Sequence, residues 1–224
     1  MSRAPLLYLI TDRKATGGRP LLEVVAAALT GIAGSGLAPG DVAVQLREKD
    51  LEGRALAELG RALRATTAAA GVRLFINDRI DVALAVGADG VHLGGTSLTP
   101  AEARAISPAL AVAVSTHGIA DVRAAVGKAA FAVFGPIHET PSKRAYGPPL
   151  GISALAEAVR LALPDLPLLA LGGIDARDVP EVVAAGAHGV ACIRPVVAAT
   201  DPAAAVRTLC QALATSSVKP PYRT

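Results

Sequence analysis

The sequence predicts a single-domain α/β protein that folds as a (β/α)8 barrel. Eight short apolar runs, rich in β-branched residues, alternate along the chain with helix-like segments. Several of these runs are apolar throughout, which is typical of parallel strands covered by helices. A chain of 224 residues can also bury one large core. The alternative, a doubly wound open sheet, is less favoured because no G-x-G-x-x-G pattern follows the first run.

The eight predicted strands are Leu6–Ile10, Val42–Leu46, Arg73–Ile76, Gly90–Leu93, Leu110–Val114, Ala130–Phe134, Pro167–Ala170 and Gly189–Ile193. The predicted helices span 20–34, 52–70, 79–86, 99–106, 118–128, 152–162, 176–185 and 201–214. Thr99 before Pro100 is typical of a helix start, and Gly87 is typical of a helix end. The barrel domain is therefore expected at 1–214, and the tail 215–224 is expected to be disordered.

Composition and charge narrow the class of protein. Apolar residues make up 52% of the chain and aromatic residues 3%, so the core consists mainly of Ala, Val, Leu and Ile. The net charge of +3 is small and its cations are scattered, which argues against nucleic-acid binding. No apolar run is long enough for a membrane span or a signal peptide, so we expect a cytoplasmic protein. Cys192 and Cys210 lie in apolar runs and are predicted to be buried free thiols.

Polar residues follow nearly every predicted strand, whereas the strands themselves are apolar. In a barrel of this class the carboxyl ends of the strands form the mouth that carries the active site. After the second strand, Gln45, Arg47 and Lys49 alternate along the chain and therefore point the same way. The third and fifth strands end at residues that extend this polar set: Asn77, Asp78, Ser115 and His117. We therefore expect an active site that binds an anion.

A long loop between Phe134 and Gly151 separates the sixth strand from the next helix. It contains four prolines, so it is predicted to be a shaped loop. Thr140, Ser142 and Lys143 place two hydroxyls and one ammonium group within four residues, which suits an anionic ligand. An ordinary solvated surface loop is the alternative, and the residues leave it open.

Two further positions have both a functional and a structural interpretation. Gly172 and Gly173 follow the seventh strand, where barrels of this class often bind phosphate through backbone N–H groups, but a glycine pair also makes a tight turn. Asp78 lies among the cations and could hold Mg2+ against a diphosphate, but it could equally cap a helix.

Six motifs in order resemble one enzyme family. They are YLITD, QLREKD, NDR with AVGADGVHLG, VSTH, FGP–ETPSK with GPPLG, and ALGGI with AAGAHGVACI. Together they resemble thiamine-phosphate synthase and its relative, the TenI-type thiazole tautomerase, over residues 6–210. The synthase resemblance implies a homodimeric TIM barrel that uses Mg2+. It joins a hydroxymethylpyrimidine diphosphate to a thiazole phosphate through a pyrimidine cation.

The same resemblance assigns roles to the residues of the mouth. It implies that Arg47, Lys49 and Lys143 act in catalysis on the diphosphate, and that Asp78 binds the metal. Gln45 would contact the pyrimidine. The other implied contacts are Asn77 and Ser115 with the diphosphate, Thr140 and Ser142 with the thiazole, and Gly172, Gly173, Ile193 and Arg194 with the thiazole phosphate.

One departure from the synthase pattern bears on the choice of reaction. Ser97 stands where synthases have a second metal-binding Asp, and tautomerases also lack that Asp. His117 matches the acid/base position of the tautomerase, although synthases commonly have histidine there too. Gln45, Lys49 and the Asn77–Asp78 pair favour the synthase, because a tautomerase handles no diphosphate. A barrel that binds a thiamine precursor without catalysis is the third possibility, and the retained cations argue against it.

Overall fold

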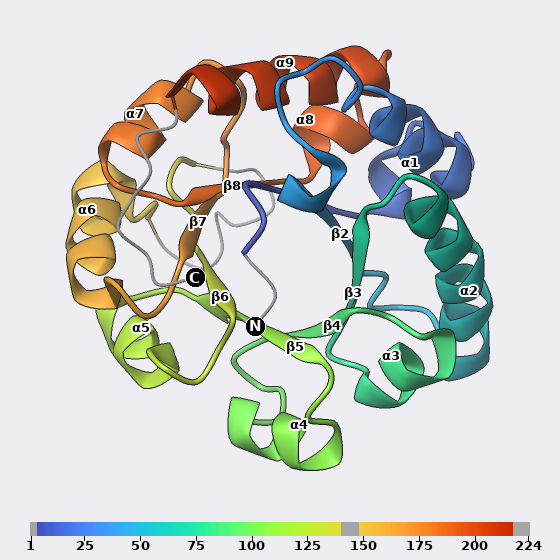
Figure 1. Cartoon of the computed structure of the whole chain (residues 1–224), viewed down its shortest axis with the longest axis horizontal. Coiled ribbons are helices and arrows are strands. Elements are labelled where there is room, and N and C mark those ends of the chain that lie inside the picture. Colours follow the sequence, from blue (N-terminus) through green and yellow to red (C-terminus); the bar gives the residue numbers. More distant parts are fainter. Residues whose placement is uncertain (1–3, 140–147, 217–224) are drawn as a thin grey trace.

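The computed structural model describes residues 4–139 and 148–216 and confirms the barrel. Eight parallel strands pair in chain order from β1 to β8, and β8 pairs with β1 to close the sheet. The helices surround the strands, and α9 packs between α7 and α1 in that ring (Figure 1). Every strand therefore points its carboxyl end toward the same mouth.

The strands are β1 Leu7–Ile10, β2 Val42–Leu46, β3 Arg73–Asn77, β4 Gly90–Leu93, β5 Ala111–Thr116, β6 Phe131–Phe134, β7 Leu168–Leu171 and β8 Gly189–Cys192. The helices are α1 Leu21–Thr30, α2 Gly53–Ala69, α3 Ile80–Val86, α4 Pro100–Ile106, α5 Ile119–Ala125, α6 Gly151–Ala162, α7 Val179–Ala184, α8 Arg194–Val197 and α9 Pro202–Ser216. Two short 3-10 helices, η1 Arg13–Ala15 and η2 Pro39–Asp41, precede α1 and β2.

The helices differ from the prediction at several points. The predicted helix 20–34 ends at Thr30, and the predicted helix 176–185 begins at Val179. Helix α8 directly follows β8, and its four residues are too few to show a helical period in the sequence. Helix α9 continues through Thr215 and Ser216, which the sequence had assigned to a disordered tail. The hydroxyl of Thr215 donates to the carbonyls of Gln211 and Ala212, at 2.9 and 3.1 Å, and so stays on the last helical turn. Cys192 and Cys210 are buried free thiols, as predicted.

The barrel interior has an aromatic layer. Tyr8, Phe75 and Phe131 meet edge to face, with ring centroids 5.2 to 5.6 Å apart. Small residues make room for these rings on the neighbouring strands. At Gly90, for example, a Cβ would lie 2.3 Å from the Phe75 ring. A separate aliphatic layer packs between the outside of the barrel and its helices.

Strand register places a polar layer directly above this aromatic layer. Side chains alternate along a strand, so the residues two positions beyond Phe75 and Gly90 also face inward. These residues are Asn77 and His92, and they pair in register across β3 and β4. The interior thus changes from aromatic to polar toward the carboxyl ends of the strands.

Candidate active site

A chain of hydrogen-bonded side chains crosses the barrel just beneath the mouth. The Gln45 amide nitrogen donates to the Tyr8 hydroxyl at 3.2 Å. That hydroxyl lies 3.3 Å from His92 Nδ1, and His92 Nε2 lies 2.8 Å from the Ser115 hydroxyl. Gln45, Tyr8 and His92 are buried, and Ser115 is half-buried. We call these four residues the polar relay.

The members of the polar relay are neutral near pH 7. Burial, and to a smaller degree the positive charge of Arg47, lowers the pKa of His92 to about 3. Burial raises the pKa of Tyr8 well above its ordinary value, so the phenol keeps its proton. Arg47 follows β2 two positions beyond Gln45, so alternation along the strand puts both side chains on the inner face. A cation therefore stands beside a neutral polar floor.

A second group of bonds fixes the backbone that carries Arg47. The buried Thr11 hydroxyl donates to Glu48 Oε1 at 2.7 Å and accepts the Arg47 backbone N–H at 2.9 Å. The Glu48 carboxylate also accepts the backbone N–H of Arg13, at 3.1 and 3.2 Å. These bonds tie the end of β2 to the end of β1. Neither Thr11 nor Glu48 was predicted as a site residue, although they lie inside the YLITD and QLREKD motifs.

The cations at this end of the barrel divide into paired and unpaired ones. Arg13 and Lys14 bind Asp50, at 2.5 and 2.7 Å, and their hydrogen bonds hold the pKa of that carboxyl below its usual range. Across residues 4–139 and 148–216, no carboxylate pairs with Arg47 or Lys49. Arg47 is half-buried and Lys49 is exposed. Their charges are available to an anionic ligand.

Asp78 has an unusual backbone at the end of β3. Its φ of 66° makes it the one non-glycine residue with positive φ in the described part of the chain. Its N–H donates to the carbonyl of His92 at 2.8 Å, and its carboxylate is exposed. Asp78 does not cap the next helix, because the N-cap of α3 is Arg79. The helix-cap alternative is therefore wrong.

Ser97 and His117 have local partners at the mouth. The Ser97 hydroxyl accepts the backbone N–H of Gly94 at 2.8 Å and closes the turn after β4. His117 follows β5, and its Nδ1 lies 2.6 Å from the Gly135 carbonyl oxygen. Because a carbonyl only accepts, Nδ1 carries a proton, and Nε2 is the basic nitrogen of the neutral ring.

The glycine pair after β7 is packed against the start of the long loop. Gly172 and Gly173 have φ values of 107° and 66°. A Cβ on Gly172 would lie 2.6 Å from Pro136, and one on Gly173 would lie 2.8 Å from His138 Cβ. The His138 N–H donates to the Gly172 carbonyl at 3.0 Å. Close approach of the chain to itself thus requires both glycines, whatever ligand they contact.

The remaining predicted site residues lie in two places. Ile193 and Arg194 follow β8, next to the Gly172–Gly173 turn because β7 and β8 pair. Arg19 donates to the Val197 carbonyl at 3.0 Å and so fastens α8 to the loop after β1. Thr140, Ser142 and Lys143 lie outside the described residues.

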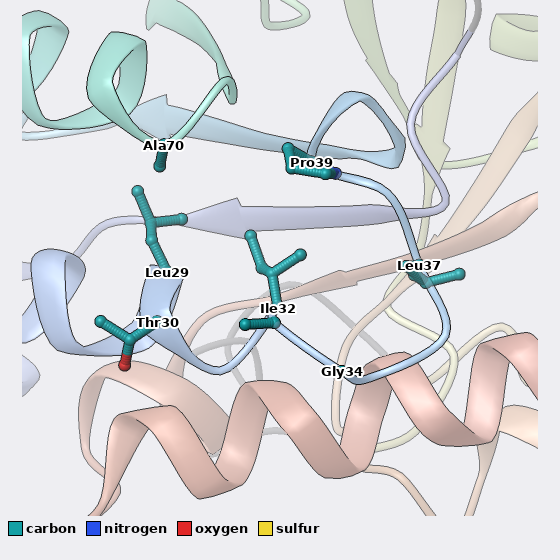
Figure 2. A pocket seen from close by; sticks show the side chains of 8 residues that line it. Leu29, Thr30, Ile32, Gly34, Leu37, Pro39 and Ala70 are labelled. Atoms are coloured by element: carbon teal, nitrogen blue, oxygen red, sulfur yellow. The ribbon is translucent and has the colours of Figure 1, made fainter.

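A cavity of about 360 Å3 lies beside the carboxyl end of α1 (Figure 2). Its lining comes from Leu29 and Thr30 at the end of α1, from the segment between α1 and β2, and from Ala70 after α2, which places it near the amino ends of the strands. The lining has no charged residue, and its Thr30 hydroxyl is bonded to the Ala27 carbonyl at 2.7 Å. This cavity offers no groups for acid–base or phosphate chemistry.

Comparisons with known proteins agree on one family. A family model described as thiamine monophosphate synthase matches residues 7–196. A putative thiamine-phosphate synthase of Geobacter sulfurreducens is 49% identical over 205 residues, which are 91% of this chain and 92% of that protein. The thiamine-phosphate synthase of Roseiflexus castenholzii is 45% identical over 212 residues, 93% of this chain and 88% of that protein. The structure of a thiamine phosphate pyrophosphorylase from Pyrococcus furiosus superposes with a TM-score of 0.81 at 32% identity, covering 94% of this chain and 96% of that one.

Proposed function

Because this chain belongs to the thiamine monophosphate synthase family, we propose that it is a thiamine-phosphate synthase. The reaction joins an aminopyrimidine that carries a methylene diphosphate to a thiazole phosphate. The bond between the methylene carbon and the diphosphate oxygen breaks, and its electron pair leaves with the diphosphate. The lone pair of the thiazole nitrogen then forms the new bond to the methylene carbon. The products are thiamine phosphate and diphosphate, and no other reactant is consumed.

One observation carries the proposal: an unpaired cation lies beside a buried, neutral polar layer. Arg47 follows β2 on the inner face that Gln45 occupies within the relay, and no described carboxylate pairs with it. A leaving diphosphate gains negative charge as its bond to carbon breaks, so a cation fixed at that place stabilises the transition state. Lys49 follows β2 and Asn77 is the last residue of the neighbouring β3, and both would contact the same diphosphate. Gln45 and Ser115 would meet the substrate from the relay.

The residues present fit a Mg2+ ion that binds mainly through the substrate. No group of three His, Cys, Asp or Glu residues in 4–139 and 148–216 could hold a metal. Asp78 offers one exposed carboxylate, and Mg2+ commonly binds one or two carboxylates together with phosphate oxygens. Bound there, the ion would neutralise charge on the diphosphate. Ser97 adds a neutral hydroxyl that already closes a turn, so Asp78 is the metal-binding residue we propose.

The thiazole phosphate would bind where two neighbouring strands end. Gly172 and Gly173 follow β7, and Ile193 and Arg194 follow β8 at the start of α8. We assign Thr140 and Ser142 to the thiazole and Lys143 to the diphosphate on the family resemblance.

We also propose that the protein is a cytoplasmic homodimer. Within the part of the chain that the structure describes, no helix is both long and apolar enough to span a membrane.

The thiazole tautomerase is a second candidate because of two observations. Ser97 stands where the synthases have a second carboxylate for the metal, and His117 presents a basic Nε2 at the mouth. An imidazole so placed could move a proton between two positions of a thiazole ring. A tautomerase has no diphosphate to stabilise, however, and it would leave Arg47 and Lys49 without a role.

One assay separates these functions. The purified protein, Mg2+ and both phosphorylated precursors should release diphosphate and form thiamine phosphate. Isomerisation of a thiazole carboxylate without coupling would instead establish the tautomerase, and binding without either reaction would establish a non-catalytic barrel.

A matched pair of variants tests whether Lys143 acts on the diphosphate together with Arg47 and Lys49. Lys143→Ala should lower kcat by about 100-fold or more, the usual loss when a donor to transition-state charge is removed. Lys128→Ala is the control, because Lys128 is exposed and precedes β6 at the opposite end of the barrel. Equal kcat values in the two variants would remove Lys143 from the mechanism.

A further inference from the structure

We propose that the polar relay has a single direction of hydrogen bonding in the working enzyme, and that this direction selects the aminopyrimidine. Ser115 then donates to the diphosphate, and Gln45 offers its amide oxygen to the exocyclic amino group. Tyr8 and His92 are positioning residues that couple the two ends. The inference rests on the proposed function and extends it to substrate specificity.

When Tyr8 and His92 both use their protons within the relay, proton counting leaves two directions. The Tyr8 hydroxyl has one proton, and a neutral His92 has one N–H. If Tyr8 donates to His92 Nδ1, then Nε2 carries the ring proton and donates to Ser115, while Tyr8 accepts from the Gln45 NH2 group. In the reverse direction Ser115 donates to Nε2, Nδ1 donates to Tyr8, and Tyr8 donates to the Gln45 oxygen. One reversal therefore changes what both ends present to the mouth.

Burial keeps the relay to these two directions. A doubly protonated His92 would donate from both nitrogens and break the sequence of bonds, but His92 is only 3% exposed. The lowered pKa of His92 agrees with a ring that stays neutral. The groups that face the ring are neutral too, since Tyr8 and Ser115 occupy its nitrogens. The nearby charge is that of Arg47, which also disfavours protonation.

The anion sets the direction from the Ser115 end. Diphosphate oxygens only accept hydrogen bonds, so Ser115 has to donate its proton to them. Ser115 can then only accept from His92, which fixes the proton on Nε2 and makes Tyr8 the donor to Nδ1. Tyr8 in turn accepts from the Gln45 NH2 group, the direction that the geometry of Gln45 and Tyr8 shows. Binding of the diphosphate thus orients an amide at the far side of the barrel.

The Gln45 end then recognises an amino group. In this direction the Gln45 amide oxygen has no hydrogen-bond partner among the described residues, and it is not a fully buried atom. It can accept a hydrogen bond from an exocyclic amino group of the pyrimidine. An oxo group at the same position would place one acceptor against another. Turning the amide round would break its bond to Tyr8, so the relay opposes the oxo analogue.

The kinetic test compares two pyrimidine diphosphates that differ only in an amino or an oxo group. The wild type should prefer the amino compound in kcat/KM by about 100-fold or more. Tyr8→Phe keeps the ring and removes the bond that fixes Gln45, so the preference should fall by roughly tenfold. Phe75→Leu is the control, because Phe75 packs against the Tyr8 ring without belonging to the relay. It should lower stability and leave the preference unchanged.

A spectroscopic test is independent of turnover. With inorganic diphosphate bound, long-range 1H–15N spectra should show a protonated Nε2 and an unprotonated Nδ1 for His92. A proton on Nδ1, or an unchanged preference in Tyr8→Phe, would overturn the inference. A wild type without coupling activity would overturn the proposed function instead, and the His92 spectrum would still decide the direction of the relay.

Discussion

Removal of the Thr11 hydroxyl is the most direct test of how the protein holds Arg47 in place. Thr11→Val replaces one oxygen by a methyl group of similar size at a site that is 1% exposed. The change deletes the 2.7 Å bond to the Glu48 carboxylate and the 2.9 Å bond from the Arg47 N–H. A bond to a charged group contributes about 1.5–3 kcal/mol and a neutral one about 1 kcal/mol. We therefore expect the free energy of unfolding to fall by about 2.5–4 kcal/mol.

Urea unfolding followed by circular dichroism measures this loss. With a slope of about 3 kcal/mol per M, the midpoint should fall by roughly 1 M. Thr208→Val is the matched control, because its exposed hydroxyl donates only to the Ala204 carbonyl within α9. That variant should stay within about 0.5 kcal/mol of wild type. Equal midpoints for the two variants would refute the idea that Thr11 fastens the end of β2. In the proposed reaction Thr11→Val should also lower kcat/KM, because the Arg47 backbone loses its anchor.

Three further predictions follow from packing, titration and metal binding. Gly90→Ala should cost about 1–3 kcal/mol of stability, because its methyl would lie 2.3 Å from the Phe75 ring and 2.5 Å from the Ala111 oxygen, whereas Gly40→Ala meets nothing within 4 Å. Equal melting temperatures of these two variants would contradict the close packing of the interior. Below its unfolded pKa of 6.5, His92 binds a proton in the unfolded state but not in the folded state until about pH 3, so it lowers stability by up to about 1.4 kcal/mol per pH unit on acidification. The stability advantage of wild type over His92→Gln should therefore shrink between pH 6.5 and 4, and a constant difference would argue against a neutral His92. Ser97→Asp should lower the Mg2+ concentration that half-saturates coupling, and an unchanged value would place the metal away from position 97.

The fold followed from the sequence because its signals are local and repeat. The ends of each strand lie within one or two residues of the predicted ends, because an apolar run bounded by turn residues can be recognised from the sequence alone. Alternation along β2 correctly put Gln45 on the inner face, where it bonds to Tyr8. Helix α8 was not predicted because four residues are too few to show a helical period in hydrophobicity. The positive φ of Asp78 was not predicted either, because the neighbouring residues carry no signal for a left-handed backbone at this position.

The polar relay lay beyond sequence reasoning for a different reason. Tyr8 and His92 are 84 residues apart and belong to β1 and β4, which are not neighbours in the sheet. Their contact exists only because the barrel closes and brings opposite walls within reach of two side chains. Nothing in the sequence around Tyr8 or His92 predicts that these two side chains meet. Glu48 was missed for another reason. Its carboxylate points away from the face that Gln45 and Arg47 share and bonds to Thr11 and Arg13, which follow β1.

The order of layers in the barrel explains how a single arginine, Arg47, could strongly stabilise a leaving diphosphate at the mouth. The rings of Tyr8, Phe75 and Phe131 fill the interior below the relay, so that side of the site has no room for bulk water. Charges, that of Arg47 included, interact more strongly where the surroundings are less polarisable than water. The same charge would act on a diphosphate held above the relay. Fixed, neutral dipoles beneath it would need little reorganisation when that diphosphate leaves. An aromatic floor and an uncharged relay therefore strengthen the one effect on which the proposed chemistry depends.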